Sequence, residues 1–409
     1  MIAMDALFVI ESLRSGIPTR RSTTILPDLR QEISARIVDD LQRLSEDETV
    51  SGRMIWGQYG QGKTHALTTL EHLALERNFA VSRVTLSREV ACHDLLAFYR
   101  EAAAKIRTPD STIDGMAQHL AKLPPEKVMN ATLFQSNRYE HTLPLTVLES
   151  YLFSEGESKE KLYADLMGNR LPISEVKSLF KQARGQRVEI PRFVVAEHAK
   201  AYVALMADLI QLCGFEGWVI LIDEAELIGR LGRLSRLKAY RNLIWLLNWH
   251  DGAKQQALYG LVAAATRLQD DLWYGRKNED RTVMPELAAA RAMQNPGTAR
   301  KEMEDFFSRA ISADALHIRP ARPMELRALI EEVVALHGVA YAWNAHLDSD
   351  ALMRELGTQP VRTYIRAALE ALDIDFLYGM EQIPASLGYD QAALVEAQEE
   401  LPTSNDDDF

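Results

Sequence analysis

The residues best suited to chemistry are those from Gly57 to Thr64, which read Gly-Gln-Tyr-Gly-Gln-Gly-Lys-Thr. They match G-x-x-x-x-G-K-[ST], the P-loop pattern that binds nucleotide phosphates. Its glycines let the backbone wrap closely around a phosphate, and its N–H groups form an anion-binding nest at a helix N-terminus. Lys63 would contact the β- and γ-phosphates, and the Thr64 hydroxyl would bind Mg²⁺. The pattern predicts an ATP site lined by Gly57, Gln58, Tyr59, Gly60, Gln61, Gly62, Lys63, Thr64 and the following His65.

The segments on either side of this loop have the patterns that a P-loop requires. Residues 53–56 read Arg-Met-Ile-Trp, and the three apolar residues after Arg53 predict a short buried strand. Residues 65–74 repeat leucine at helical spacing, and residues 79–86 give the next strand signal. Strand, loop, helix and strand together form the opening βαβ unit of a parallel sheet.

An acidic pair follows a second apolar run. Val219–Ile222 are four consecutive apolar residues, followed by Asp223 and Glu224. Such a run predicts a fully buried parallel strand, and open α/β sheets bind ligands at the carboxyl ends of their strands. The pattern is that of a Walker B element, Val219–Glu224, in which Asp223 holds Mg²⁺ directly or through water. Glu224 would polarise the attacking water as a general base. The alternative is a strand that ends in a solvated acidic turn.

Further strands and helices present three more candidate residues. A strand predicted at 258–265 ends at Thr266, which could reach the γ-phosphate or the attacking water, or could simply cap the strand. Arg309 ends the helix before a short strand at 315–318, where it can point out of the subunit. Arg362 lies near the start of a helix that runs to about residue 372.

The chain divides by pattern into four parts. Amphipathic helices are expected at 5–16 and 29–44, and helical patterns fill about 92–216, far more chain than a single crossover helix needs. The predicted organisation is an N-terminal helical segment at 1–50, a P-loop domain at 51–320 with a helical insertion at about 92–216, a helical lid at 321–378, and a final helix with an acidic, disordered tail at 379–409.

Composition narrows the function classes. The chain has 409 residues, of which 47% are hydrophobic and 25% charged, as in ordinary soluble proteins. No run of about 18 apolar residues and no signal peptide are visible, and Cys92 and Cys213 are expected to be reduced thiols, so a cytoplasmic protein without a membrane span is expected. The net charge of −12 argues against nonspecific coating of nucleic acid by a monomer, but leaves room for a basic lining in a ring or filament.

Two segments concentrate basic side chains, a run in the insertion and an arginine-rich helix. The run comprises Lys181, Arg184, Arg187 and Arg192, and the helix carries Arg230, Arg233, Arg236, Lys238 and Arg241. Such charges are most often solvated faces, and DNA contact is the alternative for the run. Most charges of the helix are expected to be solvated, with some facing a neighbouring subunit or a central pore.

From about residue 51 to 378, the order of these elements resembles the AAA+ ATPases and their STAND and origin-recognition-like branches. The resemblance implies an α/β fold, with an AAA+-like parallel sheet flanked by helices, a large helical insertion and a C-terminal helical lid. It also implies a catalytic set in which Lys63 and Glu224 are joined by Thr266 as first sensor, Arg309 as arginine finger for the next subunit, and Arg362 as second sensor. Other arginines compete for the finger and second-sensor roles: Arg267, Arg276, Arg281 and Arg366.

A narrower resemblance rests on three segments. Residues 10–20, the P-loop with His65, and the Pro-x-Arg start of the lid helix resemble the ATP-binding proteins of BREX-type phage-defence loci. That resemblance implies a cytoplasmic, oligomeric ATPase that associates with double-stranded DNA and is often encoded beside a superfamily 2 helicase. The chain departs from the pattern where Val361 separates Pro360 from Arg362.

Three functional hypotheses follow. The first is an ATP-hydrolysing ring or filament with its sites between subunits. The second is a slow, nucleotide-gated switch or scaffold that recruits an effector, and Glu224 favours the first because a pure binder needs no general base. The third, an initiator- or loader-like DNA ATPase, rests on fold similarity alone, and no winged-helix pattern is visible after the lid.

Overall fold

The computed structural model describes most of the chain. The described residues are 3–15, 19, 25–110, 115–135, 138–250, 257–275, 279–312 and 314–379. The predicted final helix and acidic tail therefore lie outside the described residues from 380 onward, as do residues 16–18, Arg20 and Arg276.

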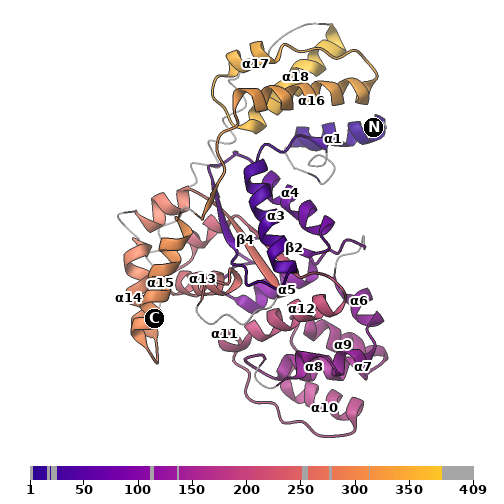
Figure 1. Ribbon diagram of the computed structural model, residues 1–409, viewed down its shortest axis with the longest axis vertical. Helices are drawn as coiled ribbons and strands as arrows, with labels where there is room; N and C mark the ends of the chain where they lie inside the picture. Colours follow the sequence, from indigo (N-terminus) through magenta and orange to yellow (C-terminus); the bar gives the residue numbers. More distant parts are fainter. Residues whose placement is uncertain are drawn as a thin grey trace.

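A five-stranded parallel sheet lies at the centre of the molecule, in the order β2-β3-β4-β1-β5 (Figure 1). The strands lie where the apolar runs predicted them, to within one residue at each end: β1 (Arg53–Gly57), β2 (Ala80–Thr85), β3 (Trp218–Asp223), β4 (Leu258–Ala265) and β5 (Leu316–His317). Because β4 lies between β1 and β3, the carboxyl ends of all three strands meet at one edge of the sheet.

Helices cover both faces of the sheet, which explains why its central strands are apolar throughout. Ile55 and Leu221 point to the face covered by α3 (Gln31–Ser45) and α4 (Lys63–Glu76). Trp56 and Ile220, one residue along each strand, belong to the larger core on the other face. Successive strand residues point to opposite faces, so burial of both faces demands continuous apolar strands.

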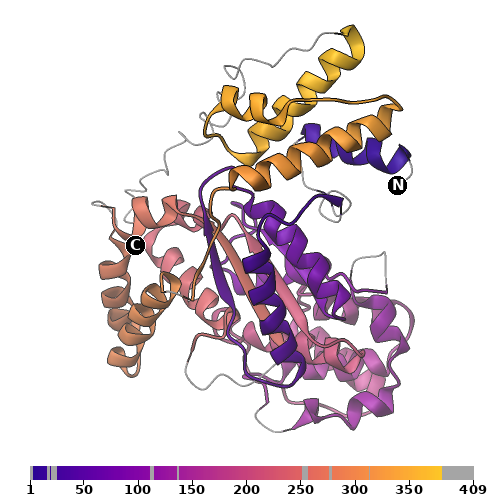
Figure 2. The same ribbon diagram turned by 45° about the horizontal axis from the view of Figure 1, so that its top comes forward.

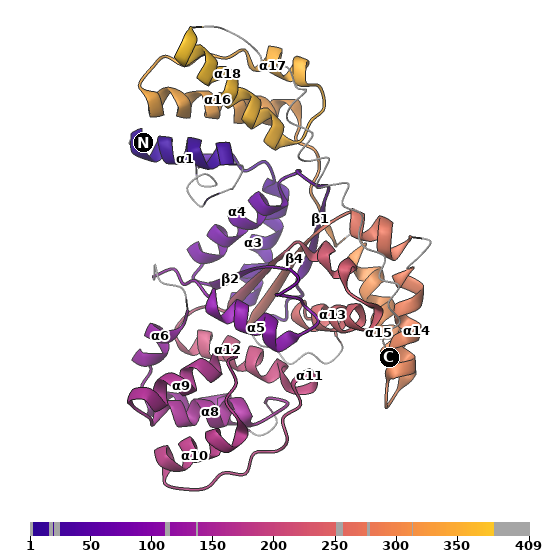
Figure 3. The ribbon, with the colours of Figure 1, turned by 180° about the vertical axis from the view of Figure 1, so that it is seen from behind.

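The long segment between β2 and β3 is helical, as expected. Its elements are α5 (Leu95–Ala104), α6 (Ala117–Lys122), α7 (Pro125–Met129), the short 3₁₀ helix η1 (Thr132–Phe134), α8 (Leu143–Leu152), α9 (Gly156–Leu166), α10 (Ile173–Arg184), α11 (Val195–His198) and α12 (Lys200–Leu212). Helices α5 and α12 lie against the sheet, and α8, α9 and α10 form the end of the molecule farthest from the C-terminal helices (Figure 3).

After β3 the chain forms η2 (Ala225–Arg230) and α13 (Arg233–Leu246). After β4 come the π-helical turn η3 (Gln269–Trp273) and a hairpin of α14 (Asp280–Arg291) and α15 (Pro296–Ala310), which lies beside the sheet (Figure 2).

One arginine of α13 is an exception to the expected solvated face. Arg236 is buried and donates to both carboxylate oxygens of Asp280 at 3.0 Å, and the Tyr240 hydroxyl donates to the same carboxylate at 2.9 Å. This network holds α14 against α13.

The C-terminal helices are α16 (Pro323–Tyr341), α17 (Ser349–Leu356) and α18 (Val361–Tyr378). They share an apolar core with α1 (Ala3–Ser15), the first helix of the chain, and lie beyond the carboxyl edge of the sheet (Figure 1). The two predicted N-terminal helices therefore pack in different cores, α1 with the C-terminal helices and α3 with the sheet. None of the helices in the described ranges is long and apolar enough to cross a membrane.

A polar network joins α1 to these helices. Arg14 donates to Asp373 through Nη2 at 2.6 Å and also through Nη1. His337 lies 3.1 Å from Asp373 through Nε2 and accepts from the Trp343 indole through Nδ1 at 2.9 Å, which assigns its proton to Nε2. The network ties the start of the chain to the C-terminal helices.

Candidate nucleotide site

The P-loop connects β1 to α4 at the carboxyl edge of the sheet. Gly60 (φ 75°) and Gly62 (φ 92°) have left-handed backbones, which glycine adopts without strain. Gly62 immediately precedes the first turn of α4, so the loop presents the N-terminus of this helix. A Cβ on Gly60 would come within 3.2 Å of Pro360 Cβ, which places the loop directly beneath the start of α18.

Lys63 is a buried cation that points back over the loop. Its Nζ donates to the carbonyl oxygens of Gly57 at 3.2 Å and Gln58 at 3.3 Å, and the residue is only 9% exposed. Neutral carbonyls compensate a buried ammonium incompletely, so an anion in the loop would stabilise it further. The Gln61 side chain accepts from the Gln58 N–H at 2.8 Å and holds the loop closed on itself. The loop fits a phosphate group.

The two predicted Mg²⁺ ligands lie side by side. The Thr64 hydroxyl donates to Oδ2 of Asp223 at 3.2 Å, although the two residues are far apart in sequence. Asp223 ends β3 and is almost fully buried. A hydroxyl and a carboxylate beside a phosphate-binding loop are the hard oxygen ligands that Mg²⁺ prefers, so this donor set fits the ion.

Glu224 occupies a strained turn after β3. Its φ of 58° is left-handed, which is uncommon for a residue with a side chain and recurs at functional sites. Partial burial raises the pKa of the Glu224 carboxyl above its ordinary value of 4.5, and the negative charges of Asp223 and Glu226 raise it further. Glu226 accepts a hydrogen bond from the Ala265 N–H at 2.9 Å and so joins this turn to the end of β4.

These residues line one cavity of about 270 Å³ between the sheet and the C-terminal helices. Its polar part is formed by the P-loop from Tyr59 to His65, by Asp223, Glu224 and Glu226, and by Arg30 and Arg362. Its apolar part comes from α1, the 26–29 segment and the C-terminal helices: Leu13, Leu26, Pro27, Leu29, Leu329, Val361 and Ile365. The cavity therefore offers charges for phosphates and an apolar slot for a base.

Arg362 and His65 both line this cavity. Arg362 lies over the Tyr59 ring, with its guanidinium carbon 5.5 Å from the ring centroid, so the expected second sensor faces the loop. Burial lowers the pKa of His65, which keeps its imidazole neutral near pH 7.

Arg30 and Arg83 also belong to the site, although the sequence did not identify them. Arg30 is 8% exposed, donates to the Gln61 carbonyl at 3.2 Å, and has a buried Nε without a partner among the described residues. Arg83 lies on β2 and forms an ion pair with Asp223 at 3.0 Å. The one charged residue inside an otherwise uncharged strand is the available signal for Arg83, whereas nothing in the sequence distinguishes Arg30.

Two predicted catalytic residues do not line the cavity. Thr266 is next to the site, because its N–H lies 3.4 Å from the Gly57 carbonyl. Arg309 is at the other end of β1, in a polar cavity of about 200 Å³ that it shares with Gly52, Arg53 and Trp249. It is exposed, and its guanidinium carbon lies 5.0 Å from the Trp249 ring centroid. Arg309 therefore cannot reach the P-loop of its own chain.

The other arginines considered for the finger and second-sensor roles have different contacts from Arg309 and Arg362. Arg267 forms an ion pair with Asp271 at 2.6 Å, and the Arg281 guanidinium lies over the Tyr274 ring. Arg366 is half-buried on α18 and is not among the residues that line the nucleotide cavity.

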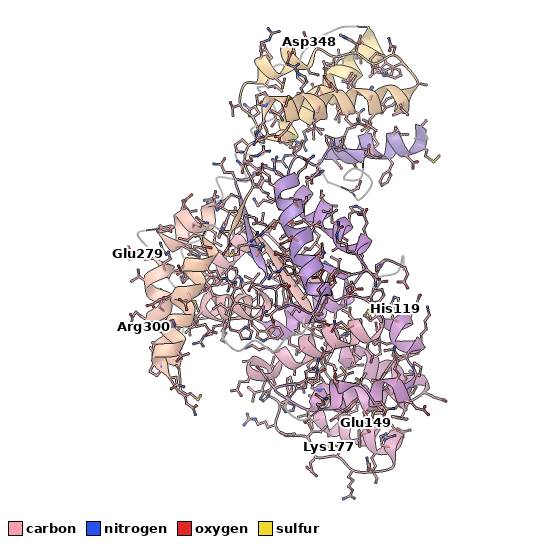
Figure 4. All side chains as sticks on the ribbon, in the orientation of Figure 1. His119, Glu149, Lys177, Glu279, Arg300 and Asp348 are labelled. Atoms are coloured by element: carbon pink, nitrogen blue, oxygen red, sulfur yellow. The ribbon has the colours of Figure 1, made fainter. Side chains whose placement is uncertain are left out.

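The basic run of the insertion is partly neutralised. All four residues of the run are exposed, and one of them, Arg184, forms an ion pair with Glu149 at 2.8 Å and lies over the Phe153 ring. Lys177, which precedes the run on α10, pairs with Glu189. Figure 4 shows Lys177 and Glu149 at the end of the molecule opposite Asp348 of the C-terminal helices. These contacts favour the interpretation of the run as a solvated face.

Comparison with known families agrees with the site. The family model described as "BREX system ATP-binding protein BrxC/D" matches residues 3–122 and 145–361. The matched ranges include the P-loop, Walker B and α1, and omit only part of the insertion and the end of the chain. No curated protein matches the chain. Because the family model covers most of the sequence, the chain belongs to the BREX system ATP-binding proteins of the BrxC/D family, whose ATP-binding role in phage defence it shares.

Proposed function

We propose that the chain is a Mg²⁺-dependent, AAA+-like ATPase that hydrolyses ATP at sites shared between copies of itself. One observation carries the proposal: Thr64 of the P-loop and Asp223 of Walker B are 3.2 Å apart in a cavity that also holds Lys63 and Glu224. A simple phosphate-binding site needs the loop but not a strained, acidic turn beside it.

The side chains have distinct roles in this reaction. The P-loop N–H groups and Lys63 bind and orient the β- and γ-phosphates. Mg²⁺, when bound through Thr64 and Asp223, would neutralise charge on the same phosphates. Glu224 accepts a proton from the attacking water, and its raised pKa brings its basicity closer to what a general base needs at neutral pH. Thr266, next to Gly57, is the proposed sensor of the γ-phosphate.

The C-terminal helices act as a lid in this proposal. They supply Arg362 and the apolar residues Leu329, Val361 and Ile365 to the cavity, while α1 supplies Leu13. Because α1 shares its core with these helices, it would move with them when the lid opens or closes. Closure over the base would exclude water from the phosphates.

Assembly follows from the position of Arg309. The residue is exposed at the opposite end of β1 from the P-loop, so it can serve only the ATP of another copy. A head-to-tail contact between unlike faces generates a ring or a filament. Each active site would then combine the P-loop of one chain with Arg309 of the next.

The test is the rate of ATP hydrolysis per subunit as the protein is diluted. We expect the rate to rise steeply from nanomolar to micromolar protein, with chelation of Mg²⁺ abolishing it, because an isolated chain has an incomplete site. The Arg309→Ala variant should show no such rise. A rate per subunit that is the same at all concentrations would mean that the monomer contains the whole site.

Association with double-stranded DNA, and with a helicase encoded nearby, is the proposed cytoplasmic role in defence. It is supported by the resemblance to the BREX ATP-binding proteins, and the net charge of −12 restricts DNA contact to a local basic surface. Binding to duplex DNA should require ATP and low salt, and should fall steeply as salt rises, with a log–log slope of about 0.9 per phosphate contacted. No binding in 50 mM salt with ATP present would remove DNA from the proposal.

A slow nucleotide-gated switch is the second candidate. It is favoured by one observation: Asp223, the proposed Mg²⁺ ligand, is held by Arg83 at 3.0 Å, an ion pair that would slow turnover. Substitution of Glu224 distinguishes a switch from an efficient ATPase.

A further inference from the structure

Arg83 places a positive charge on the predicted metal ligand. Its Nη2 lies 3.0 Å from Oδ2 of Asp223 and 3.3 Å from the Thr64 carbonyl, and its Nη1 donates to the Thr68 hydroxyl at 2.8 Å. The side chain of Asp223 is only 4% exposed, whereas that of Arg83 is 24% exposed. The guanidinium thus holds Asp223 and α4 together while one side of it stays near solvent.

The contact uses the same oxygen that faces Thr64. Asp223 Oδ2 accepts from both the Thr64 hydroxyl and Arg83, while Oδ1 accepts from the Glu224 N–H at 3.0 Å. A divalent cation between Thr64 and Asp223 would therefore meet a guanidinium on its ligand oxygen. Two cations on one carboxylate oxygen repel each other, and the side chain of Asp223 is only 4% exposed, so water screens this repulsion incompletely.

Asp223, the partner of Arg83, lines a cavity that holds two other carboxylates. Glu224 and Glu226 line the same cavity, so without Arg83 three carboxylates would face the phosphates. Lys63 is the P-loop cation, and it is held on the Gly57 and Gln58 carbonyls rather than on Asp223. Among the described residues, Arg83 is the basic side chain that forms an ion pair with Asp223, at 3.0 Å.

We propose that Arg83 competes with the divalent cation for Asp223 and thereby couples metal binding to nucleotide binding. Before any ligand binds, Arg83 would neutralise Asp223, which would weaken binding of a free cation and let a metal-free triphosphate enter. When nucleotide and cation bind together, phosphate oxygens would supply the remaining metal ligands. The cation would then replace Arg83 as the partner of the Asp223 carboxylate. The inference rests on the proposed function, because it takes Thr64 and Asp223 as the metal ligands.

The test compares Arg83→Gln with wild type by equilibrium binding of a fluorescent ATP analogue, once in EDTA and once in Mg²⁺. The quantity to compare is the dissociation constant in EDTA divided by the dissociation constant in Mg²⁺. We expect the ratio to rise about tenfold or more in Arg83→Gln, which is the lower end of what an adjacent opposite charge does to a carboxylate's affinity for a proton. Binding in EDTA should weaken and binding in Mg²⁺ should strengthen. An unchanged ratio would overturn the inference.

A second measurement needs no nucleotide. Binding of Mn²⁺ to the nucleotide-free protein, followed by electron paramagnetic resonance, should be weak in wild type and at least about tenfold tighter in Arg83→Gln. Equal Mn²⁺ binding would contradict the inference even if the wild type failed to bind the ATP analogue. That failure alone would instead contradict the proposed function, so the two ideas are separable.

Two variants control for folding and for general charge. Arg107→Gln removes an arginine that pairs with the buried carboxylate of Glu71 at 3.3 Å, outside the cavity, and should change neither measurement. Arg83→Lys keeps the charge and should give a smaller rise than Arg83→Gln. If Arg83→Gln does not fold, Arg83→Lys decides: the inference requires some rise in the ratio, because one ammonium cannot hold Asp223, Thr64 and Thr68 together.

Discussion

Replacing Arg309 with alanine is expected to lower ATP hydrolysis by the assembled protein by roughly 10³–10⁵-fold, the range that an arginine finger contributes in related phosphoryl-transfer enzymes. ATP binding should change little, because Arg309 does not line the nucleotide cavity of its own chain. The large effect has an electrostatic cause. Negative charge spreads over the γ-phosphate oxygens in the transition state, and a guanidinium from the next subunit would stabilise it there.

Arg309 has a preformed position for this role. Its guanidinium rests over the Trp249 ring and is exposed, and Trp249 itself is held by a hydrogen bond from its indole to the Gly52 carbonyl at 2.9 Å. A stacked guanidinium has fewer conformations to lose when it meets the phosphate. Arg300→Ala is the matched control, since Arg300 lies on the same helix but pairs with Glu286. The control should retain the wild-type rate.

Mixing two inactive variants decides whether the arginine acts between chains. Arg309→Ala has an intact P-loop, and Lys63→Ala has an intact Arg309, so a contact between them restores one complete site. With random head-to-tail assembly of equal amounts, about a quarter of the sites are complete and should show activity. If the mixture stays as inactive as its parts, the arginine does not act in the partner's site.

The sequence was sufficient for the sheet and for both halves of the phosphate site. Each strand lies in a mainly apolar stretch of the sequence, and each functional residue of the P-loop and Walker B is defined by its neighbours in the chain. The sequence therefore predicts that Asp223 and Thr64 lie near each other, because parallel strands bring their carboxyl ends to one edge.

The sequence was not sufficient for groups whose partners are distant in the chain. Arg83 was read as part of a strand, and only the fold brings β2 next to β3 and Arg83 against Asp223. Arg236 was placed on a helix face expected to be largely solvated, yet it is buried against Asp280. The packing of α1 with the C-terminal helices likewise depends on contacts between the two ends of the described chain. Periodicity identifies an apolar face but not the element that covers it.

Replacing Glu224 with glutamine should abolish most turnover while leaving ATP bound. Glutamine keeps the size of the side chain but cannot accept the proton of the attacking water, so we expect a loss of about 10²–10⁴-fold in the rate constant for hydrolysis. ATP affinity should be retained or rise slightly, because one negative charge near the triphosphate is removed. The variant should accumulate in its ATP-bound, assembled form, which size-exclusion chromatography with ATP can measure.

The pH dependence gives an independent signature of the same residue. Because the pKa of Glu224 is raised above 4.5, its carboxylate is lost at a higher pH than that of an ordinary glutamate, and turnover should fall on the acid side accordingly. The residual activity of Glu224→Gln should lack this acid limb, while Glu226→Gln, which alters a nearby carboxylate that hydrogen-bonds Ala265, should keep it. A slow switch predicts a different result, with Glu224→Gln scarcely changing an already low rate. The two outcomes therefore separate an ATPase that uses Glu224 as its base from a protein that only binds ATP and changes state.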